Sequence, residues 1–297
     1  MSLESADLVI LGHLAKDIIE IDGISYTSLG GVVYYGGITG SHMGLKIIII
    51  TRLKEDDFSL LEIFRKNGIK YYAYPSEETS GLRNIYSSNN MEFRDYEPLG
   101  FAGLFKKEEI PKFKSPPKFF VLGNIVTGEI DLELLEYIKI NYNNVCLDIQ
   151  GFIRFRDHGK VFYSTLSEKE RKEIISNVCV LKLDQTEARI LTNQQNITQA
   201  AKVLAQYGPK EIIITHEEGI SLYLSNSTFT FPWKNKSAVG RTGRGDTAFI
   251  SYLGSRLTKN PEESLKFAAA LTSLKLETPG PFDLPLYLVE TLIKEKY

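Results

Sequence analysis

The sequence predicts an α/β protein in which helices cover both faces of a mostly parallel, doubly wound β-sheet, with a small second β-sheet beside it. Six short and nearly uninterrupted apolar runs indicate strands that are buried on both faces, as is typical of parallel sheets. These runs cover residues 7–12, 46–53, 119–124, 145–150, 178–183 and 211–215. The segments between them are long enough for crossover helices, which parallel neighbouring strands require.

The expected helices occupy residues 58–67, 132–141, 168–176, 198–207, 247–258, 262–277 and 286–296. Ser167 and Asn260-Pro261 supply start signals, and Asn67-Gly68 supplies a stop signal. With 297 residues, of which 43% are hydrophobic, the chain is long enough for one large domain spanning residues 1–297.

Two polar and aromatic regions, residues 18–28 and 83–96, alternate in the manner of strands and do not fit crossover helices. We expect them to pair as a small sheet that acts as a lid over the carboxyl ends of the main strands; two separate surface hairpins are the alternative. Residues 222–224 and 228–231 indicate an edge hairpin.

Composition excludes several function classes. The 35 basic and 37 acidic residues nearly cancel, so no overall field favours nucleic acid or an anionic membrane. No apolar run is long enough to span a bilayer, and no secretory signal pattern is apparent. Cys146 and Cys179 lie in apolar runs and are expected to be reduced core residues. These features predict a cytoplasmic protein.

The segment Gly240-Arg241-Thr242-Gly243-Arg244-Gly245-Asp246-Thr247 directly precedes an apolar helix. Glycines let the backbone turn tightly, and the first amides of a helix have no intrahelical partner, so this segment predicts an anion site that suits phosphate. Asp246 is then placed to accept a proton from a hydroxyl that attacks the phosphate. The alternative is that the glycines make only a tight connection.

Several separated motifs resemble the ribokinase-like sugar kinases of the phosphofructokinase-B (PfkB) family over nearly the whole chain. The segment 243–246 resembles the Gly-Ala-Gly-Asp signature of that family, and Gly30-Gly31 resembles its double-glycine signature. Asp17 matches an acid that grips the substrate. The segment 181–187 resembles an Asn-x-x-Glu element with Asp184 in place of asparagine, and the segment from Thr215 to Gly219 resembles a nucleotide-side turn.

The resemblance implies phosphorylation of a small polyol with ATP and Mg²⁺. Asp246 would be the base, and the amides of Gly243, Arg244 and Gly245 would hold charge on the transferred phosphoryl group. Glu187, with Asp184, would order Mg²⁺ through water. Adenine would lie near Ala269 and Ser273. A P-loop kinase is excluded because the chain has no Gly-x-x-x-x-Gly-Lys-Ser/Thr segment, and a dinucleotide-dependent oxidoreductase is disfavoured because no Gly-x-Gly-x-x-Gly follows the first strand.

Departures from the family pattern bear on the substrate. Tyr35 stands where many members carry a sugar-binding asparagine and is the predicted substrate-binding residue; of Tyr34 and Tyr35, we expect one to pack and the other to face the substrate. The Tyr-Tyr pair beside the double glycine, together with the segment 148–154, resembles an inositol-kinase-like branch, which implies a cyclic polyol. A nucleoside whose base stacks on Tyr35 is the alternative. A catalytically silent sugar-binding or nucleotide-binding protein is the third possibility.

Gly240 replaces an aspartate that the potassium-dependent members of the family carry. We therefore expect Arg241 or Arg244 to supply the positive charge that potassium provides in those members. The exposed strands of the lid are compatible with a monomer or with a homodimer that pairs through the lid.

Overall fold

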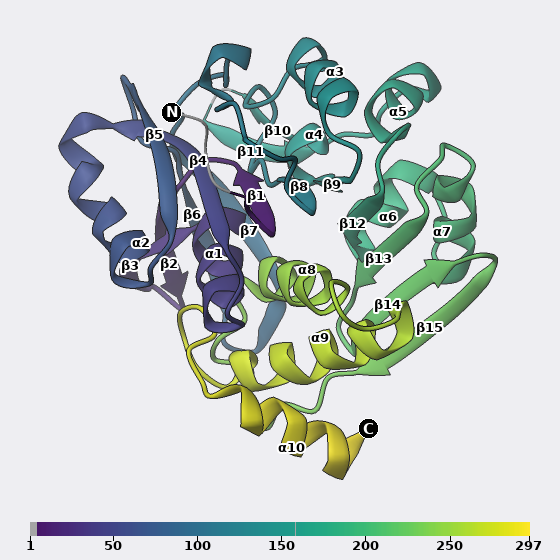
Figure 1. Ribbon diagram of the computed structural model, residues 1–297. Coiled ribbons are helices and arrows are strands. Elements are labelled where there is room, and N and C mark those ends of the chain that lie inside the picture. The colour runs from purple at the N-terminus through teal and green to yellow at the C-terminus, as the bar shows by residue number, and fades with distance from the viewer. Residues whose placement is uncertain (1–4, 158) are drawn as a thin grey trace.

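A computed structural model describes residues 5–157 and 159–297, and only the backbone of residues 90–94. Within these residues the main sheet has nine strands in the order β15-β14-β13-β12-β9-β8-β1-β4-β5 (Figure 1). The strands are β1 (Leu8–Leu11), β4 (Ile47–Lys54), β5 (Lys70–Ser76), β8 (Phe119–Leu122), β9 (Val145–Asp148), β12 (Val180–Asp184), β13 (Glu211–Thr215), β14 (Gly219–Leu224) and β15 (Ser227–Pro232). Neighbouring strands pair in parallel everywhere except at the β14–β15 edge hairpin. There β14 runs antiparallel to both β13 and β15.

The parallel strands are buried on both faces. In β1, Leu8 and Ile10 join the apolar core on one face, whereas Val9 and Leu11 join the core on the other. The first face is covered by α1 (Val32–His42), α2 (Glu62–Lys66), α8 (Arg244–Ser255) and α9 (Pro261–Leu276), and the second by α3 (Leu132–Asn141), α5 (Glu168–Ile175), α6 (Gln185–Thr192) and α7 (Ile197–Ala205). The predicted α/β fold with helices on both faces is confirmed.

Several element boundaries differ from the prediction. The expected helix at 58–67 is a 3-10 turn, η1 (Glu55–Leu61), followed by the short α2. The expected strand at 145–150 ends at Asp148, because α4 (Gln150–Ile153) begins two residues later. The half-exposed edge strand β5 was not predicted from the sequence, nor was the hairpin of β10 (Arg154–Asp157) and β11 (Lys160–Tyr163). Two further elements are the 3-10 turn η2 (Lys107–Glu109) and the outer helix α10 (Leu286–Lys296).

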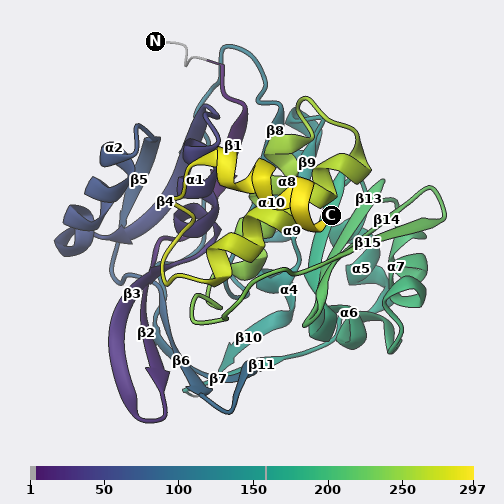
Figure 2. The same cartoon turned by 90° about the horizontal axis from the view of Figure 1, so that it is seen from below.

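The two alternating regions do pair, as expected, into a separate four-stranded sheet. Its order is β3 (Ile24–Gly30), β2 (Ala15–Ile21), β6 (Gly81–Ser87) and β7 (Asn90–Gly100). The central pair β2–β6 is parallel, and the two outer pairs are antiparallel. Figure 2 shows the β2–β3 hairpin projecting beyond the main sheet, with the β10–β11 hairpin beside β7. We call this four-stranded sheet the lid.

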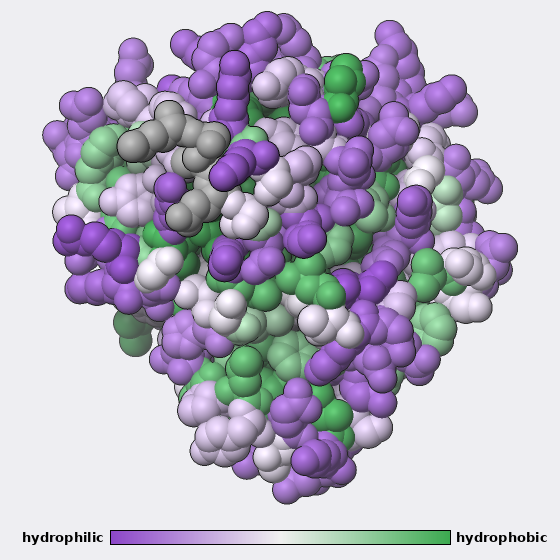
Figure 3. All heavy atoms as spheres, in the orientation of Figure 1, coloured by the Kyte–Doolittle hydropathy of each residue, from purple (hydrophilic) through white to green (hydrophobic). Residues whose placement is uncertain are grey.

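Other sequence expectations concern the surface and the cysteines. The face in Figure 3 is dominated by hydrophilic residues, with hydrophobic side chains gathered in smaller patches. Among the described residues, no helix combines the length and the apolar character that crossing a bilayer requires. Cys146 is fully buried and Cys179 is partly exposed, and both thiols are free. Burial raises the pKa of Cys146, as expected for an unreactive core thiol.

Candidate active site

The segment 240–246 forms a loop that leads into α8. Gly243 is the N-cap of the helix and has a left-handed backbone, with φ of 80°. The helical hydrogen bond from the Thr247 amide to the Gly243 carbonyl closes the first turn, so the amides of Gly245 and Asp246 lie within the turn that has no intrahelical acceptors. The amide of Arg244 donates to the Arg241 carbonyl at 3.2 Å.

Side chains pack so closely against this loop that its glycines are required. A Cβ on Gly243 would lie 2.3 Å from the ring of Tyr35, and a Cβ on Gly245 would lie 2.9 Å from Nζ of Lys182. Gly240 is confined as well, since a Cβ there would lie 2.0 Å from the Thr278 carbonyl oxygen. The aspartate that some family members carry at this position therefore has no room in this chain.

Asp246 lies in the first turn of α8 and lines a small pocket. The residues around this pocket are Gln150, Lys182, Asp184, Thr215, Arg241, Gly243, Arg244, Gly245 and Asp246. The loop glycines, Asp246, Asp184 and Thr215, which were predicted separately from the sequence, thus come together at one place. The pocket combines three basic side chains with a partly exposed carboxylate, an arrangement that suits a phosphate and a proton acceptor.

Lys182 lies below the loop and was not predicted as a site residue. It is buried in β12 and pairs with the buried carboxylate of Asp148, at 2.8 Å between Nζ and Oδ2. Burial alone would lower the pKa of Lys182, but the carboxylates of Asp148, Glu187 and Asp246 together raise it above the usual value. Lys182 is therefore a fixed positive charge at the base of the pocket.

Lys275 lies on another side of the same loop, within α9. Its ammonium group donates to the carbonyl oxygens of Gly240 and Thr242 and lies 5.1 Å from the centre of the Tyr35 ring. Burial lowers the pKa of Lys275 to about 7, with the carboxylate of Asp246 acting in the opposite direction. Lys275 is therefore a cation next to the loop carbonyls that was not predicted, in addition to Arg241 and Arg244, which line the pocket.

Asp17 and the double glycine lie where the lid meets the main body. A Cβ on Gly30 would lie 2.1 Å from Oδ2 of Asp17, and Gly31 has φ of 87° at the N-cap of α1. Oδ1 of Asp17 accepts a hydrogen bond from the Leu82 amide in the lid, at 2.8 Å. The two glycines therefore let α1 begin directly beside the Asp17 carboxylate.

Tyr35 does not have the exposed position that the sequence predicted. Its side chain is buried against Gly243, with the hydroxyl 3.5 Å from Oγ of Ser28. Burial raises the pKa of Tyr35, and the charges of Asp17 and Asp246 raise it further. Tyr35 is thus a packing residue with no open face for a base to stack on, and Asp17 lines a different pocket from the one that Asp246 lines.

The lid contacts the loop directly. Tyr86 of β6 hydrogen-bonds through its hydroxyl to Oγ1 of Thr242, at 3.1 Å. The buried Arg154 donates to Gln150 and Tyr163 and stacks over the ring of Tyr96 in β7. Both contacts hold the lid sheet against the pocket side of the molecule.

Asp184 and Glu187 form a capping box at the start of α6. The amide of each donates to the carboxylate of the other, at 2.8 and 2.7 Å. Glu187 is 1% exposed, and burial followed by the charge of Asp184 raises its pKa to about 8. Among the described residues, no group of three or more acidic, histidine or cysteine side chains is arranged to hold a metal.

These groups fit Mg²⁺ only in an outer role. Mg²⁺ keeps several waters and binds mostly through substrate phosphates. Asp184 faces the pocket and is able to accept from such waters, with Glu187 holding Asp184 in place. A bound Mg²⁺ would supply charge neutralisation for the transferred phosphoryl group.

The expected adenine site is closed in this structure. Ala269 and Ser273 are fully buried, and Oγ of Ser273 accepts from the Lys234 amide at 2.8 Å. The hydroxyl of Tyr297 donates to the Pro232 carbonyl at 2.7 Å and lies 3.3 Å from Oγ of Ser273. Gly219 is also structural, because a Cβ there would lie 2.3 Å from the Phe231 carbonyl oxygen.

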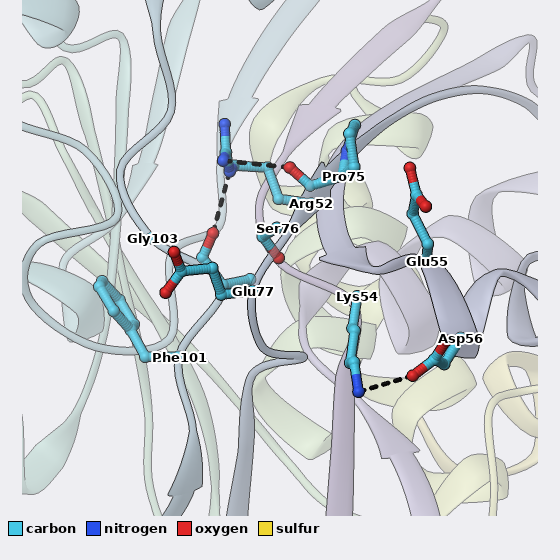
Figure 4. A pocket seen from close by; sticks show the side chains of 10 residues that line it. Arg52, Lys54, Glu55, Asp56, Pro75, Ser76, Glu77, Phe101 and Gly103 are labelled. Atoms are coloured by element: carbon cyan, nitrogen blue, oxygen red, sulfur yellow. Dashed lines mark hydrogen bonds and ion pairs between the residues drawn. The ribbon is translucent and has the colours of Figure 1, made fainter.

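A larger cavity of about 750 Å³ lies elsewhere and contains none of the expected site residues. Figure 4 shows Arg52 donating to the Pro75 carbonyl and Lys54 paired with Asp56 at 2.6 Å. Arg52 also pairs with Glu109. Because this cavity contains neither the glycine loop nor Asp246, size alone does not make it the functional site.

Comparisons with known proteins agree with this geometry. A family model described as pfkB family carbohydrate kinase matches residues 50–285. A pyrophosphate-dependent kinase of the ribokinase family, solved with a pyrophosphate analogue and myo-inositol, is 26% identical, with a TM-score of 0.87 over 96% of this chain and 99% of that one.

Two further relatives extend the comparison. A cytidine kinase from Thermococcus kodakarensis is 24% identical over 273 residues, which cover 86% of this chain and 91% of the relative. Ribokinase from Arabidopsis thaliana, solved with ribose and ATP, shares the fold at 19% identity, with a TM-score of 0.74 over 99% of both chains.

Proposed function

Because the chain belongs to the pfkB family of carbohydrate kinases and is thus a phosphotransferase, we propose that it phosphorylates a hydroxyl group of a small cyclic polyol, with Asp246 as the general base. The observation that carries this proposal is the position of Asp246. It lies in the first turn of α8, beside the glycine loop, and lines the same pocket as Lys182, Arg241 and Arg244.

Each group at the site has a role in this reaction. Asp17 accepts hydrogen bonds from the hydroxyls of the polyol, and Asp246 accepts the proton of the attacking hydroxyl. The amides of the first turn of α8 and the ammonium group of Lys182 stabilise negative charge on the transferred phosphoryl group. The lid excludes water, so that the phosphoryl group passes to the polyol and not to water.

The acceptor is proposed to be an inositol or another cyclic sugar. The relative solved with myo-inositol is more similar to this chain than the ribokinase solved with ribose. A nucleoside is the second candidate, because a cytidine kinase is also similar over most of the chain. The buried ring of Tyr35 favours the polyol, since a nucleoside would need an exposed surface for its base.

An acceptor screen tests this function. Phosphate monoester formation is measured by phosphorus NMR with inositols, hexoses, pentoses and nucleosides, using both ATP and pyrophosphate as donors with Mg²⁺. We expect turnover with a cyclic polyol and a loss of about 10³-fold or more in Asp246→Asn, since the general base and its charge are removed. Binding without turnover by the unaltered protein would instead support a silent binding protein, and turnover with nucleosides alone would support a nucleoside kinase.

Other parts of the prediction stay proposals. A single domain over residues 1–297 includes residues 1–4 and 158, which lie outside the described residues. A cytoplasmic location and a monomer or lid-paired homodimer are likewise proposed. Exposed Ile24 and Tyr26 on the edge strand β3 are the residues through which such a dimer would pair.

A further inference from the structure

The space between the β14–β15 hairpin and α9, where a nucleotide base was expected, is occupied by the protein's own contacts. The Lys234 amide bonds to Ser273, and the Tyr297 hydroxyl bonds to the Pro232 carbonyl. The ring of Tyr297 also packs edge-on against Phe231, with 6.0 Å between ring centres. A base would have to break these contacts before it could reach Ala269.

The route from the loop toward that space is filled as well. The guanidinium group of Arg244 lies 5.9 Å from the centre of the Trp233 ring, and Nε1 of Trp233 donates to the His216 carbonyl at 2.9 Å. Arg244 stands at the alanine position of the resembled signature, so a long cationic side chain replaces a methyl group here. Arg244 is 4% exposed and still contributes to the pocket lining.

What the loop does offer a ligand is positive charge. Arg241, Arg244 and Lys182 line the pocket together, against the carboxylates of Asp184 and Asp246. Guanidinium groups bind phosphate oxygens in pairs, and Lys182 adds a fixed charge from below. Such a pocket recognises phosphate groups by themselves and does not need a base for affinity.

We infer that the phosphoryl donor is an inorganic polyphosphate, of which pyrophosphate is the smallest, and not a nucleoside triphosphate. This inference rests on the proposed kinase function. The acceptor oxygen forms a bond to the terminal phosphorus while the bridging P–O bond breaks. The bridging oxygen leaves with the remaining chain, which is inorganic phosphate when the donor is pyrophosphate, and the hydroxyl proton passes to Asp246. The reaction involves no oxidation or reduction.

Donor binding is measured independently of turnover. The Asp246→Asn variant is titrated calorimetrically, in the presence of Mg²⁺, with imidodiphosphate and with the non-hydrolysable ATP analogue AMP-PNP. We expect imidodiphosphate to bind at least about tenfold more tightly, because only its phosphates meet complementary groups. Equal or tighter binding of AMP-PNP would overturn the inference, whether or not the acceptor screen finds a substrate. A failed acceptor screen with tight imidodiphosphate binding would instead count against the proposed acceptor chemistry alone.

Two variants identify the residues responsible. Arg244→Ala is expected to weaken imidodiphosphate binding about tenfold or more, because a direct cation is lost. Tyr297→Ala is expected to leave imidodiphosphate binding unchanged and to strengthen AMP-PNP binding. Tyr297→Phe, which keeps the ring, is the matched control and should resemble the unaltered protein for both ligands. The inference fails if Arg244→Ala leaves imidodiphosphate binding intact while its thermal unfolding is normal.

Discussion

Two buried lysines lie against the same loop and differ in their partners. Lys182 in β12 meets the carboxylate of Asp148, whereas Lys275 in α9 meets the neutral carbonyls of Gly240 and Thr242. The pKa of Lys182 is raised, while that of Lys275 is lowered to about 7. Neighbouring carboxylates compensate the burial of the Lys182 ammonium group, whereas at Lys275 the charge of Asp246 is opposed by burial and by the charges of Arg241 and Arg244.

The largest effect is expected from breaking the charged pair. Lys182→Met leaves the Asp148 carboxylate buried without its cation, so the free energy of unfolding should fall by about 3–5 kcal/mol. Urea unfolding followed by circular dichroism measures this change. The double variant with Asp148→Asn removes the stranded charge and should recover much of the loss. If the single and double variants are equally stable, the pair is not the source of the effect.

Lys275→Met is expected to lower activity while leaving the free energy of unfolding nearly unchanged. The variant no longer buries an ammonium group, and this gain offsets the loss of the hydrogen bonds to the two carbonyl oxygens. The free energy of unfolding should therefore change by less than about 1 kcal/mol. The loop carbonyls lose the donors that orient them, and we expect kcat/KM to fall by about 10- to 100-fold as the adjacent amides lose their alignment. Added ammonium or methylammonium ions should restore part of the rate in this variant only. If the free energy of unfolding falls by as much as the activation free energy rises, Lys275 has a merely structural role.

The pH dependence of kcat/KM should distinguish the two lysines. With a pKa of about 7, Lys275 is charged below that pH and loses its proton above it, so a decline in rate is expected as the pH rises through about 7. In Lys275→Arg the guanidinium group stays charged, and the decline should move to higher pH. Rates measured between pH 6 and 9 test this shift, and identical profiles for the two proteins would contradict it.

The smallest effect is expected on the lid side of the loop, where neither lysine is touched. Tyr86→Phe removes the hydrogen bond to Thr242 and keeps the ring. We expect KM for the acceptor to rise by about two- to tenfold, equivalent to roughly 0.5–1.5 kcal/mol. Steady-state kinetics measure this change. An effect on the kinetics as large as that of Lys275→Met would show that the lid contact matters for activity as much as the buried lysine does.

The sequence predicted what depends on local pattern. Apolar runs located six of the seven parallel strands, and the glycines with Asp246 located the loop, because a tight turn before a helix needs those residue types. A lysine inside the apolar segment Leu181-Lys182-Leu183 was a signal that was not used, since a charged residue in a buried strand needs a partner. Lys275 in an apolar helix was a similar signal.

Side-chain direction could not be predicted in the same way. Tyr35 was expected to face the substrate, but the missing side chain of Gly243 leaves a space that its ring fills. The closure near Ser273 depends on contacts among β15, α9 and Tyr297, which are distant in sequence and carry no joint pattern. Tertiary packing decides both cases.

The hydrogen bond between Tyr86 and Thr242 joins the sheet that bears Asp17 to the loop that precedes Asp246. If the acceptor and the donor each bind more tightly when this contact is made, each raises the affinity for the other by the same factor. The bond between these two hydroxyl groups is therefore a place where binding of one substrate can be coupled to binding of the other.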